Sequence, residues 1–213
     1  MQSNQLPLIF YTNPMSRGSV VRWMLEEIGC SYETKLLEYG TTMKAPEFLA
    51  INPMGKVPAL KYGEAVITET IAICTYLAQI FPDAQLTPDK GDHKAWAEYY
   101  RWLFFAAGPL EAAITNKSLG VEVQKERERS VGYGSFEQVL SVIESTLKDK
   151  TYIAGNRFSA ADLILSSYLK FYMTFGIIPD HSVFTDYCTF HKNRPAAHRA
   201  EKIDEDLAKN NQH

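Results

Sequence analysis

Short apolar runs and amphipathic segments alternate along the first part of the chain. Residues 8–11, LIFY, are apolar and lie between proline-containing segments, which predicts a strand followed by a turn. Residues 16–29 carry apolar side chains at helical spacing, and Gly29 suits the C-cap of a helix. The looser alternation over residues 32–37 predicts a second strand.

The same region continues with a polar loop and two further strands. The pattern predicts strands at residues 57–61 and 64–67, joined by a tight turn at residues 62–63. Helical spacing returns at Thr68 and ends before Pro82. The order β-α-β, loop, β-β-α takes about 80 residues, which is too short for a doubly wound sheet. It predicts a small four-stranded mixed sheet with helices on its faces.

The second half of the chain shows helical spacing and no strand pattern. Its amphipathic or apolar segments lie at residues 93–114, 126–148 and 163–175. Proline, glycine and polar residues at 83–92 predict a linker. We therefore expect an α+β first domain at residues 1–82 and an all-helical second domain at residues 93–213. The charged run KERER at residues 125–129 is interpreted as a solvated helix start.

Composition narrows the classes of function. The chain has 213 residues, 46% of them hydrophobic, and a net charge of −3, which is ordinary for a soluble globular protein. This charge offers no footprint for nucleic acid or an anionic membrane, and no apolar run approaches the ~20 residues of a membrane span. The first residues lack the basic and apolar parts of a signal peptide. We expect a cytoplasmic protein.

The cysteines argue against metal and dithiol chemistry. Cys30, Cys74 and Cys188 are far apart and form no CxxC pair, so they predict neither a zinc site nor a redox motif. Their odd number, without a secretion signal, favours a reducing compartment. They are interpreted as packing residues, and no metal site is predicted.

A proline stands where a strand is about to begin. In INPMGKVPAL, residues 51–60, Pro58 cannot donate a hydrogen bond to a sheet. If the Val57-Pro58 bond is cis, the backbone N–H and C=O of Val57 face outward and can bind an extended peptide as an added strand would. The alternative is a trans proline that protects a sheet edge.

The later helix of this region begins at Thr68-Glu69-Thr70. Free N–H groups at a helix start attract anions, and Thr70 can add its hydroxyl to a bound carboxylate. Glu69 can accept hydrogen bonds from an ammonium group, so the pair suits the head of an amino acid. The alternative is simple capping, with Thr68 as N-cap and Glu69 as an acid in the first turn.

The turn at residues 13–18, between the first strand and the first helix, places Ser16 at a helix start. No histidine or acid is near in the sequence to activate Ser16 as a nucleophile. Its neutral hydroxyl can instead donate to an anion. A thiolate held there would have its pKa lowered from ~8.5 to roughly 6 or 7. The alternative is an ordinary serine N-cap.

Together these features resemble the cytosolic glutathione transferases. The resemblance spans about residues 8–200 and rests on SRGSVVRWMLEEIG, PEFLAINPMGKVPAL, ITETIAICTYLA, FSAADLIL and RPAAHRA. It implies a thioredoxin-like first domain followed by an all-helical domain. In FSAADLIL, Ser159 and Asp162 make an N-cap box, which is interpreted as structural.

The resemblance gives the first two features a shared ligand, glutathione. It implies that Pro58 is cis and that Val57 pairs with the cysteinyl backbone of glutathione. Glu69 and Thr70 would hold the γ-glutamyl head. The glycine carboxylate would meet a lysine, either Lys44 or Lys56.

The resemblance also gives the third feature a role. Ser16 would donate to the glutathione thiolate, as in the serine-type classes, and Arg17 could also favour the thiolate. Thr12 and Asn13 are the alternative donors in the same turn. The usual E/Q-S pair is E-T here, which keeps a hydroxyl. The turn has no cysteine, and the long helix lacks the His-Lys pair of beta-like members, so the chain resembles a bacterial, theta-related serine enzyme of open class.

The second substrate would bind between the two domains. On the helix from residue 93, side chains at helical spacing could line that wall together with Met15: Tyr99, Trp102, Phe105, Ala106 and Pro109. The alternative is that these side chains form an interdomain core. An aromatic cleft beside a polar thiol site fits apolar electrophiles.

The activity that the resemblance implies is that of a glutathione S-transferase. It would join glutathione, as co-substrate, to hydrophobic electrophiles without a metal or nucleotide cofactor, and glutathione peroxidase activity uses the same chemistry. Two alternatives stay open: a non-catalytic member that binds ligands or proteins, and a glutathione-dependent isomerase. The run PMSRGS differs from the SSC-like run of the isomerases. The resemblance to this family also implies a homodimer.

Overall fold

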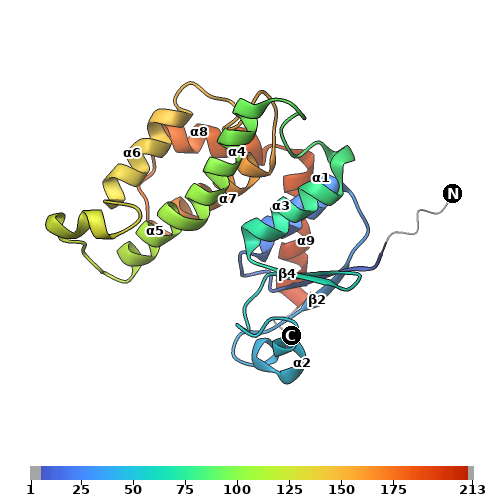
Figure 1. Cartoon of the computed structure of the whole chain (residues 1–213). Helices are drawn as coiled ribbons and strands as arrows, with labels where there is room; N and C mark the ends of the chain where they lie inside the picture. Colours follow the sequence, from blue (N-terminus) through green and yellow to red (C-terminus); the bar gives the residue numbers. More distant parts are fainter. Residues whose placement is uncertain (1–5, 211–213) are drawn as a thin grey trace. The chain divides into compact units, whose positions relative to one another are not determined.

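Two compact units make up the protein (Figure 1). The computed structural model describes residues 6–210. One unit runs to Ala84 and resumes at Pro195, and the other runs from Gln85 to Arg194. The boundary at Ala84 falls inside the expected linker. The last helix, α9 (Pro195–Asn210), groups with the first unit, whereas we expected it in the second domain.

A mixed sheet of four strands forms the centre of the first unit, within the described residues. The strands are β1 (Leu8–Thr12), β2 (Glu33–Leu36), β3 (Ala59–Tyr62) and β4 (Ala65–Thr68), in the order β2-β1-β3-β4. β1 is parallel to β2, with Ile9 opposite Glu33, and antiparallel to β3, with Tyr11 opposite Ala59. β3 and β4 form a hairpin. The sheet predicted from the apolar runs is confirmed.

Helical elements cover both faces of this sheet. In the first unit they are α1 (Gly18–Ile28), η1 (Thr42–Lys44), α2 (Pro46–Leu49), α3 (Thr70–Ile80), η2 (Pro82–Ala84) and α9. Phe10 and its cross-strand partner Leu60 are fully buried on the face where Arg22 of α1 stacks on the Phe10 ring. On the opposite face Tyr11 packs against Phe48 of α2, with ring centroids 5.7 Å apart.

An ion pair explains why α9 belongs to the first unit. Arg22 of α1 is 1% exposed, and its Nε donates to Asp204 Oδ1 of α9 at 3.1 Å. The same guanidinium donates to Thr34 Oγ1 at 2.8 Å and stacks on the rings of Phe10 and Tyr32. A buried charge without a partner is strongly destabilising, so the carboxylate of α9 is needed at this place. α1 and α9 accordingly lie side by side (Figure 1).

The second unit is helical wherever its chain forms regular structure. Its elements are α4 (His93–Phe105), η3 (Ala106–Leu110), α5 (Glu111–Ser118), η4 (Lys125–Ser130), α6 (Phe136–Leu147), α7 (Ala160–Thr174) and α8 (Ser182–Lys192). η3 is a π-helical turn that contains Pro109. Because proline has no N–H to donate, α-helical bonding is interrupted there. Among the described helices none is long and apolar enough to cross a membrane.

The helix expected at residues 126–148 is wrong in its first part. The KERER run forms a separate exposed 3-10 helix, η4, and α6 begins only at Phe136. Between them Gly134 has φ +71°, a conformation that glycine adopts easily and that ends regular helix. Ser135 then caps α6, because its Oγ accepts a hydrogen bond from the N–H of Gln138 at 3.1 Å.

A buried polar network at the start of α7 fixes the second unit. Ser159 and Asp162 form the capping box that the sequence predicts, and Asp162 Oδ2 accepts from the Ser159 N–H at 2.9 Å. Asp162 Oδ1 accepts from the Ile153 N–H at 2.7 Å and from the Tyr187 hydroxyl at 2.8 Å. Burial outweighs these bonds and raises the pKa of Asp162 to about 6.

His191 of α8 joins this network as a neutral ring. Its Nε2 donates to the Thr151 carbonyl at 2.9 Å and lies 3.8 Å from Asp162 Oδ1, too far for a hydrogen bond. Burial lowers the pKa of His191 to about 4. The contact between His191 and Asp162 is therefore not an ion pair at neutral pH.

The two pKa shifts make opposite contributions to stability. The lowered pKa of His191 contributes stability that is complete above the unfolded value of 6.5 and is lost as the pH falls through about 4. The raised pKa of Asp162 contributes stability that is present below 3.8 and is lost as the pH rises through about 6. Removing the histidine should leave only the second effect.

We therefore expect the His191→Gln variant to be destabilised less, relative to the parent, at pH 4.5 than at pH 7. The difference should be on the order of 2 kcal/mol, since one pKa unit corresponds to about 1.4 kcal/mol. Urea unfolding at both pH values measures it, and the exposed His198→Gln variant of α9 is the control. An equal destabilisation at both pH values would contradict the buried neutral state of His191.

Candidate functional site

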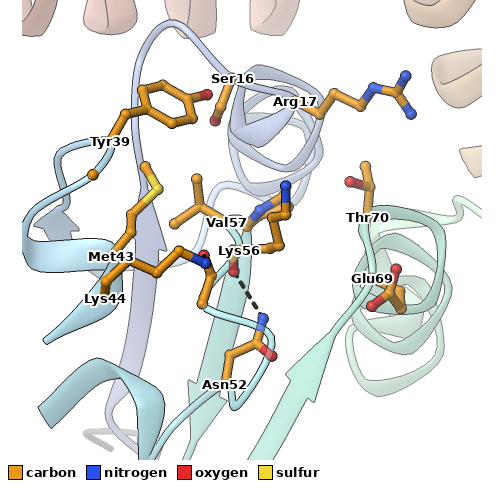
Figure 2. A pocket seen from close by; sticks show the side chains of 13 residues that line it. Ser16, Arg17, Tyr39, Met43, Lys44, Asn52, Lys56, Val57, Glu69 and Thr70 are labelled. Carbon is orange, nitrogen blue, oxygen red and sulfur yellow. Dashed lines mark hydrogen bonds between the residues drawn. The ribbon is translucent and has the colours of Figure 1, made fainter. Parts of the chain in front are cut away.

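A cavity of about 350 Å³ opens in the first unit beside the start of β3 (Figure 2). Its walls come from the turn after β1, the loop after β2, the loop before β3 and the start of α3. They comprise Ser16, Arg17, Tyr39, Gly40, Met43, Lys44, Asn52, Gly55, Lys56, Val57, Pro58, Glu69 and Thr70. All the residues that the resemblance linked to glutathione line this cavity. Sequence reasoning missed Tyr39, Met43 and Asn52: the first two carry no periodic or motif signal, and Asn52 lies within the PEFLAINPMGKVPAL run but was given no role.

The loop before β3 presents open backbone to the cavity. The Val57-Pro58 peptide bond is cis, which confirms the prediction. β3 starts only at Ala59, and among the described residues neither the N–H nor the C=O of Val57 makes a hydrogen bond to the protein. Asn52 holds the loop in place, because its Nδ2 donates to the Lys56 carbonyl at 2.8 Å. Val57 can therefore pair with an extended ligand as a neighbouring strand would.

The start of α3 also faces the cavity, and no side chain caps it. Side chains do cap α4 and α6, where Asp92 and Ser135 accept hydrogen bonds from backbone N–H groups. The first N–H groups of α3 lack intrahelical partners and can bind an anion, with the Thr70 hydroxyl beside them. Thr68 lies in β4 and Glu69 occupies the N-cap position, so the capping alternative with Thr68 as N-cap is wrong.

Glu69 has an unusual backbone conformation, with φ +68° and ψ +120°. A residue with a Cβ rarely adopts a positive φ, because the conformation is sterically strained. Strained residues of this kind are concentrated at functional sites. The conformation turns the chain from β4 into α3, and Glu69 and Thr70 both reach the cavity wall as a result. The Glu69 carboxylate is exposed there and can accept hydrogen bonds from a bound cation.

The Ser16 hydroxyl is fully engaged within its own turn. Its Oγ donates to the Asn13 carbonyl at 2.6 Å and accepts from the Gly18 N–H at 3.0 Å. The Ser16 carbonyl accepts from the Ser19 N–H at 3.2 Å. Ser16 Oγ therefore satisfies the N–H of Gly18, the first residue of α1, but Arg17 occupies the N-cap position, so the alternative with Ser16 as N-cap is wrong. To bind an anion, the hydroxyl must release the Asn13 carbonyl and redirect its proton.

The alternative donors in this turn have structural roles. The Asn13 side chain donates to the Leu37 carbonyl at 2.8 Å and accepts from the Met15 N–H at 2.9 Å, which ties the turn to the end of β2. Thr12 is fully buried, and its Oγ1 fills the space that a Cβ on Gly18 would need. Both side chains shape the turn and neither lines the cavity.

The three cations of the cavity differ in their surroundings. Lys44 Nζ donates to the carbonyls of Met54 and Gly55, at 3.1 Å in both cases, so it pins the loop before β3. Lys56 is exposed and carries no hydrogen bond or ion pair to the described residues through its ammonium group. Figure 2 shows Arg17 extending from the start of α1 toward Thr70, away from the Ser16 hydroxyl.

The expected electrophile wall on α4 is mostly buried. Tyr99, Trp102 and Ala106 are 0%, 2% and 0% exposed, so these side chains offer no surface to a substrate. Phe105 and Pro109 are partly exposed. Met15 remains accessible, with 77% of its surface exposed in the turn after β1.

The exposed aromatics of α4 are Tyr100 and Phe104, which were not among the expected wall residues. Tyr100 is 47% exposed and Phe104 is 72% exposed, and they are four residues apart on one face. Both faces of the helix are aromatic in the sequence, so the spacing alone did not indicate which face is buried. Packing of α4 against α7 determines the buried face.

Two family models match the chain. The model of the glutathione S-transferase N-terminal domain matches residues 6–79, and that of the C-terminal domain matches residues 104–193. A probable glutathione S-transferase of rice is 30% identical over 186 residues, which cover 80% of this chain and 84% of the rice protein. The chain belongs to the glutathione S-transferase family.

Two further proteins similar to this chain are also named glutathione S-transferases. Glutathione S-transferase 1 of Schizosaccharomyces pombe is 31% identical over 159 residues, which cover 69% of this chain and 67% of the yeast protein. A sphingomonad glutathione S-transferase complexed with glutathione has a TM-score of 0.75 at 25% identity, covering 92% of this chain and 98% of that one.

The similarity extends to proteins that are not named as transferases. Elongation factor 1-gamma 3 of rice is 28% identical over 141 residues, and these cover 65% of this chain but only 33% of the elongation factor. Sequence similarity alone therefore does not show that this chain is catalytic, and the geometry of the site must support that role.

The strain at Glu69 leads to a prediction about stability. Removing the Cβ relieves its share of the strain at positive φ, so Glu69→Gly should have a free energy of unfolding about 1 kcal/mol above that of Glu69→Ala, even after the entropic cost of glycine. Glu69→Ala keeps the Cβ and removes the carboxylate, and it should give no such gain. Urea unfolding of both variants tests this, and equal stabilities for Gly and Ala would rule out the strain.

Proposed function

We propose that this chain is an active glutathione S-transferase, which bonds the glutathione sulfur to an electrophilic carbon of a hydrophobic substrate. The observation that carries the proposal is the shared cavity. It combines an open backbone pair at Val57, an uncapped start of α3 and a hydroxyl at the start of α1. These groups match, in order, the middle, the amino-terminal head and the thiol of the tripeptide.

The peptide part of glutathione would bind along the loop and α3. Val57 would exchange two backbone hydrogen bonds with the cysteinyl residue, as paired strands do. The γ-glutamyl carboxylate would bind at the α3 start, with the Thr70 hydroxyl, while Glu69 accepts from its ammonium group. Because Arg17 extends toward Thr70, we assign it to this carboxylate and not to the sulfur.

The glycine carboxylate would meet Lys56, which has no other partner among the described residues. Lys44 would act indirectly, since its ammonium group already holds the carbonyls of Met54 and Gly55. Of the two lysines that the sequence left open, Lys56 would therefore bind the glycine carboxylate, and Lys44 would hold the loop in place.

The Ser16 hydroxyl would favour the ionised form of the thiol. A hydrogen bond between neutral groups contributes about 0.5–1.5 kcal/mol, whereas a bond to a charged group contributes about 1.5–3 kcal/mol. Exchanging the Asn13 carbonyl for a sulfur is therefore favourable for a thiolate and unfavourable for a neutral thiol. When the Ser16 hydroxyl proton turns from the Asn13 carbonyl to the sulfur, the pKa of the bound thiol would therefore fall.

Conjugation then needs no general base in the protein. The thiol proton passes to solvent as glutathione binds, the thiolate forms a bond to carbon, and the leaving group departs with its electron pair. The rate would come from the larger thiolate fraction and from the positioning of the two reactants. Met15, exposed beside Ser16, offers apolar contact to the electrophile. The family resemblance also supports our proposal of a cytoplasmic homodimer.

A second candidate function is binding of glutathione-like ligands without catalysis. The observation that favours it is the engaged Ser16 proton, which donates to the Asn13 carbonyl at 2.6 Å. Retention on a glutathione-affinity column together with no turnover of chlorodinitrobenzene would select this candidate. Retention with turnover would select the transferase.

The Ser16→Ala variant should lose conjugation activity and keep glutathione binding. We expect kcat to fall by roughly tenfold or more, because one charge-assisted hydrogen bond to the thiolate is lost. The dissociation constant, measured by calorimetry, should change little because the peptide contacts remain. Ser19→Ala removes an exposed hydroxyl from the same helix and serves as control. An unchanged kcat in Ser16→Ala would show that another group holds the sulfur.

The two lysines should separate in a binding experiment. Lys56→Gln should weaken glutathione binding by about two- to fivefold, with a salt-dependent loss, because an exposed ion pair contributes up to about 1 kcal/mol. Its unfolding free energy should equal that of the parent. Lys44→Gln should instead lower stability, since it releases the loop before β3. The reverse pattern would assign the carboxylate to Lys44.

A further inference from the structure

The loop after β2 places an exposed tyrosine at the same cavity. Tyr39 is 61% exposed, and its hydroxyl donates to the Met15 carbonyl at 3.3 Å. Figure 2 shows its ring at the cavity edge with the hydroxyl directed toward Ser16. Met15 is the chain neighbour of Ser16, so the two hydroxyls are anchored to one short turn.

We propose that Tyr39 is a second catalytic residue, whose hydroxyl donates a hydrogen bond to the glutathione sulfur together with Ser16. This assignment rests on the proposed transferase function. It is based on the hydrogen bonds that the two hydroxyls make in the ligand-free cavity and on the position of the Tyr39 ring.

The two hydroxyl protons differ in how readily they can be redirected. The Ser16 proton is held in a short bond of 2.6 Å to the Asn13 carbonyl. The Tyr39 bond of 3.3 Å is longer than the 2.5–3.0 Å usual for O–H···O bonds, and it lies at an exposed position. Less free energy is therefore lost when Tyr39 turns its proton toward a sulfur.

A phenol is also the stronger donor of the two. Its ordinary pKa of about 10 makes it a stronger acid than an aliphatic alcohol, so it gives a stronger hydrogen bond to an anion. The thiol proton leaves for solvent, and Tyr39 shares its own proton without transferring it. The bound thiolate would thus receive hydrogen bonds from two hydroxyl donors.

The loop that carries Tyr39 is held by its own hydrogen bonds. The Glu38 N–H donates to Thr42 Oγ1 at 2.7 Å, and the Met43 N–H donates to the Glu38 carbonyl at 3.2 Å. The next residue, Gly40, has φ +75°, which lets the chain turn sharply after Tyr39. The ring therefore stands at the cavity before a ligand arrives, as preorganised donation requires.

The decisive experiment compares Tyr39→Phe with the parent enzyme over pH. The variant keeps the ring and loses only the hydroxyl. We expect the pKa of bound glutathione, followed by the ultraviolet absorbance of its thiolate, to rise by about one unit. At pH 6.5, kcat/KM for chlorodinitrobenzene should then fall about three- to eightfold, and at pH 8.5 the loss should be smaller because the thiol ionises without help. KM for glutathione should stay within about twofold.

Two controls separate this role from a structural one. Tyr62→Phe removes a hydroxyl outside the cavity, and it should keep the parent pH profile. Thermal unfolding of Tyr39→Phe should match the parent, since the lost hydrogen bond is exposed. In the Ser16→Ala/Tyr39→Phe double variant, the pKa of the bound thiol should approach that of free glutathione.

The possible results lead to different conclusions. If the parent conjugates glutathione and Tyr39→Phe keeps its pH profile, the proposal for Tyr39 is overturned and the transferase function stands. A rate loss that is equal at all pH values, or one confined to KM, would also overturn it. If the parent binds no glutathione at all, both proposals fall.

Discussion

The candidate site depends on Asn13, which fixes the turn between β1 and α1. Its side chain joins the Leu37 carbonyl to the Met15 N–H, and its own carbonyl receives the Ser16 hydroxyl. Met15 in turn offers its carbonyl to Tyr39. Asn13 therefore positions both hydroxyls near the expected sulfur: it accepts the Ser16 hydroxyl directly and holds Met15, which accepts the Tyr39 hydroxyl. Because these hydrogen bonds form without a ligand, the turn keeps its shape when glutathione binds. Only the hydroxyl protons of Ser16 and Tyr39 have to change direction.

Local signals explain how much of the structure was predictable. Apolar runs and helical spacing indicated all four strands of the described sheet, along with α1 and α3, because alternation along a strand and a buried helix stripe are encoded within a few residues. The open backbone at Val57 was also predictable, since Pro58 cannot join a ladder. Family resemblance then supplied the ligand, which the spacing of residues could not.

The rest depends on contacts that sequence spacing does not encode. α4 is aromatic on both faces, and only its packing against α7 buries Trp102 and leaves Phe104 exposed. Tyr39 sits in an irregular loop, where no periodicity marks a residue as part of a wall. Lys44 and Lys56 look equivalent in the sequence and differ only through the two carbonyls that Lys44 reaches.

The pairing of Arg22 with Asp204 has a consequence for biosynthesis. The two residues are 182 positions apart, so a ribosome releases the sheet long before it releases the carboxylate that neutralises the cation of α1. Until α9 emerges, the nascent first unit must keep this guanidinium in water and its helical layer loose. The buried charge of the amino-terminal half therefore finds its partner only when the last helix has been synthesised.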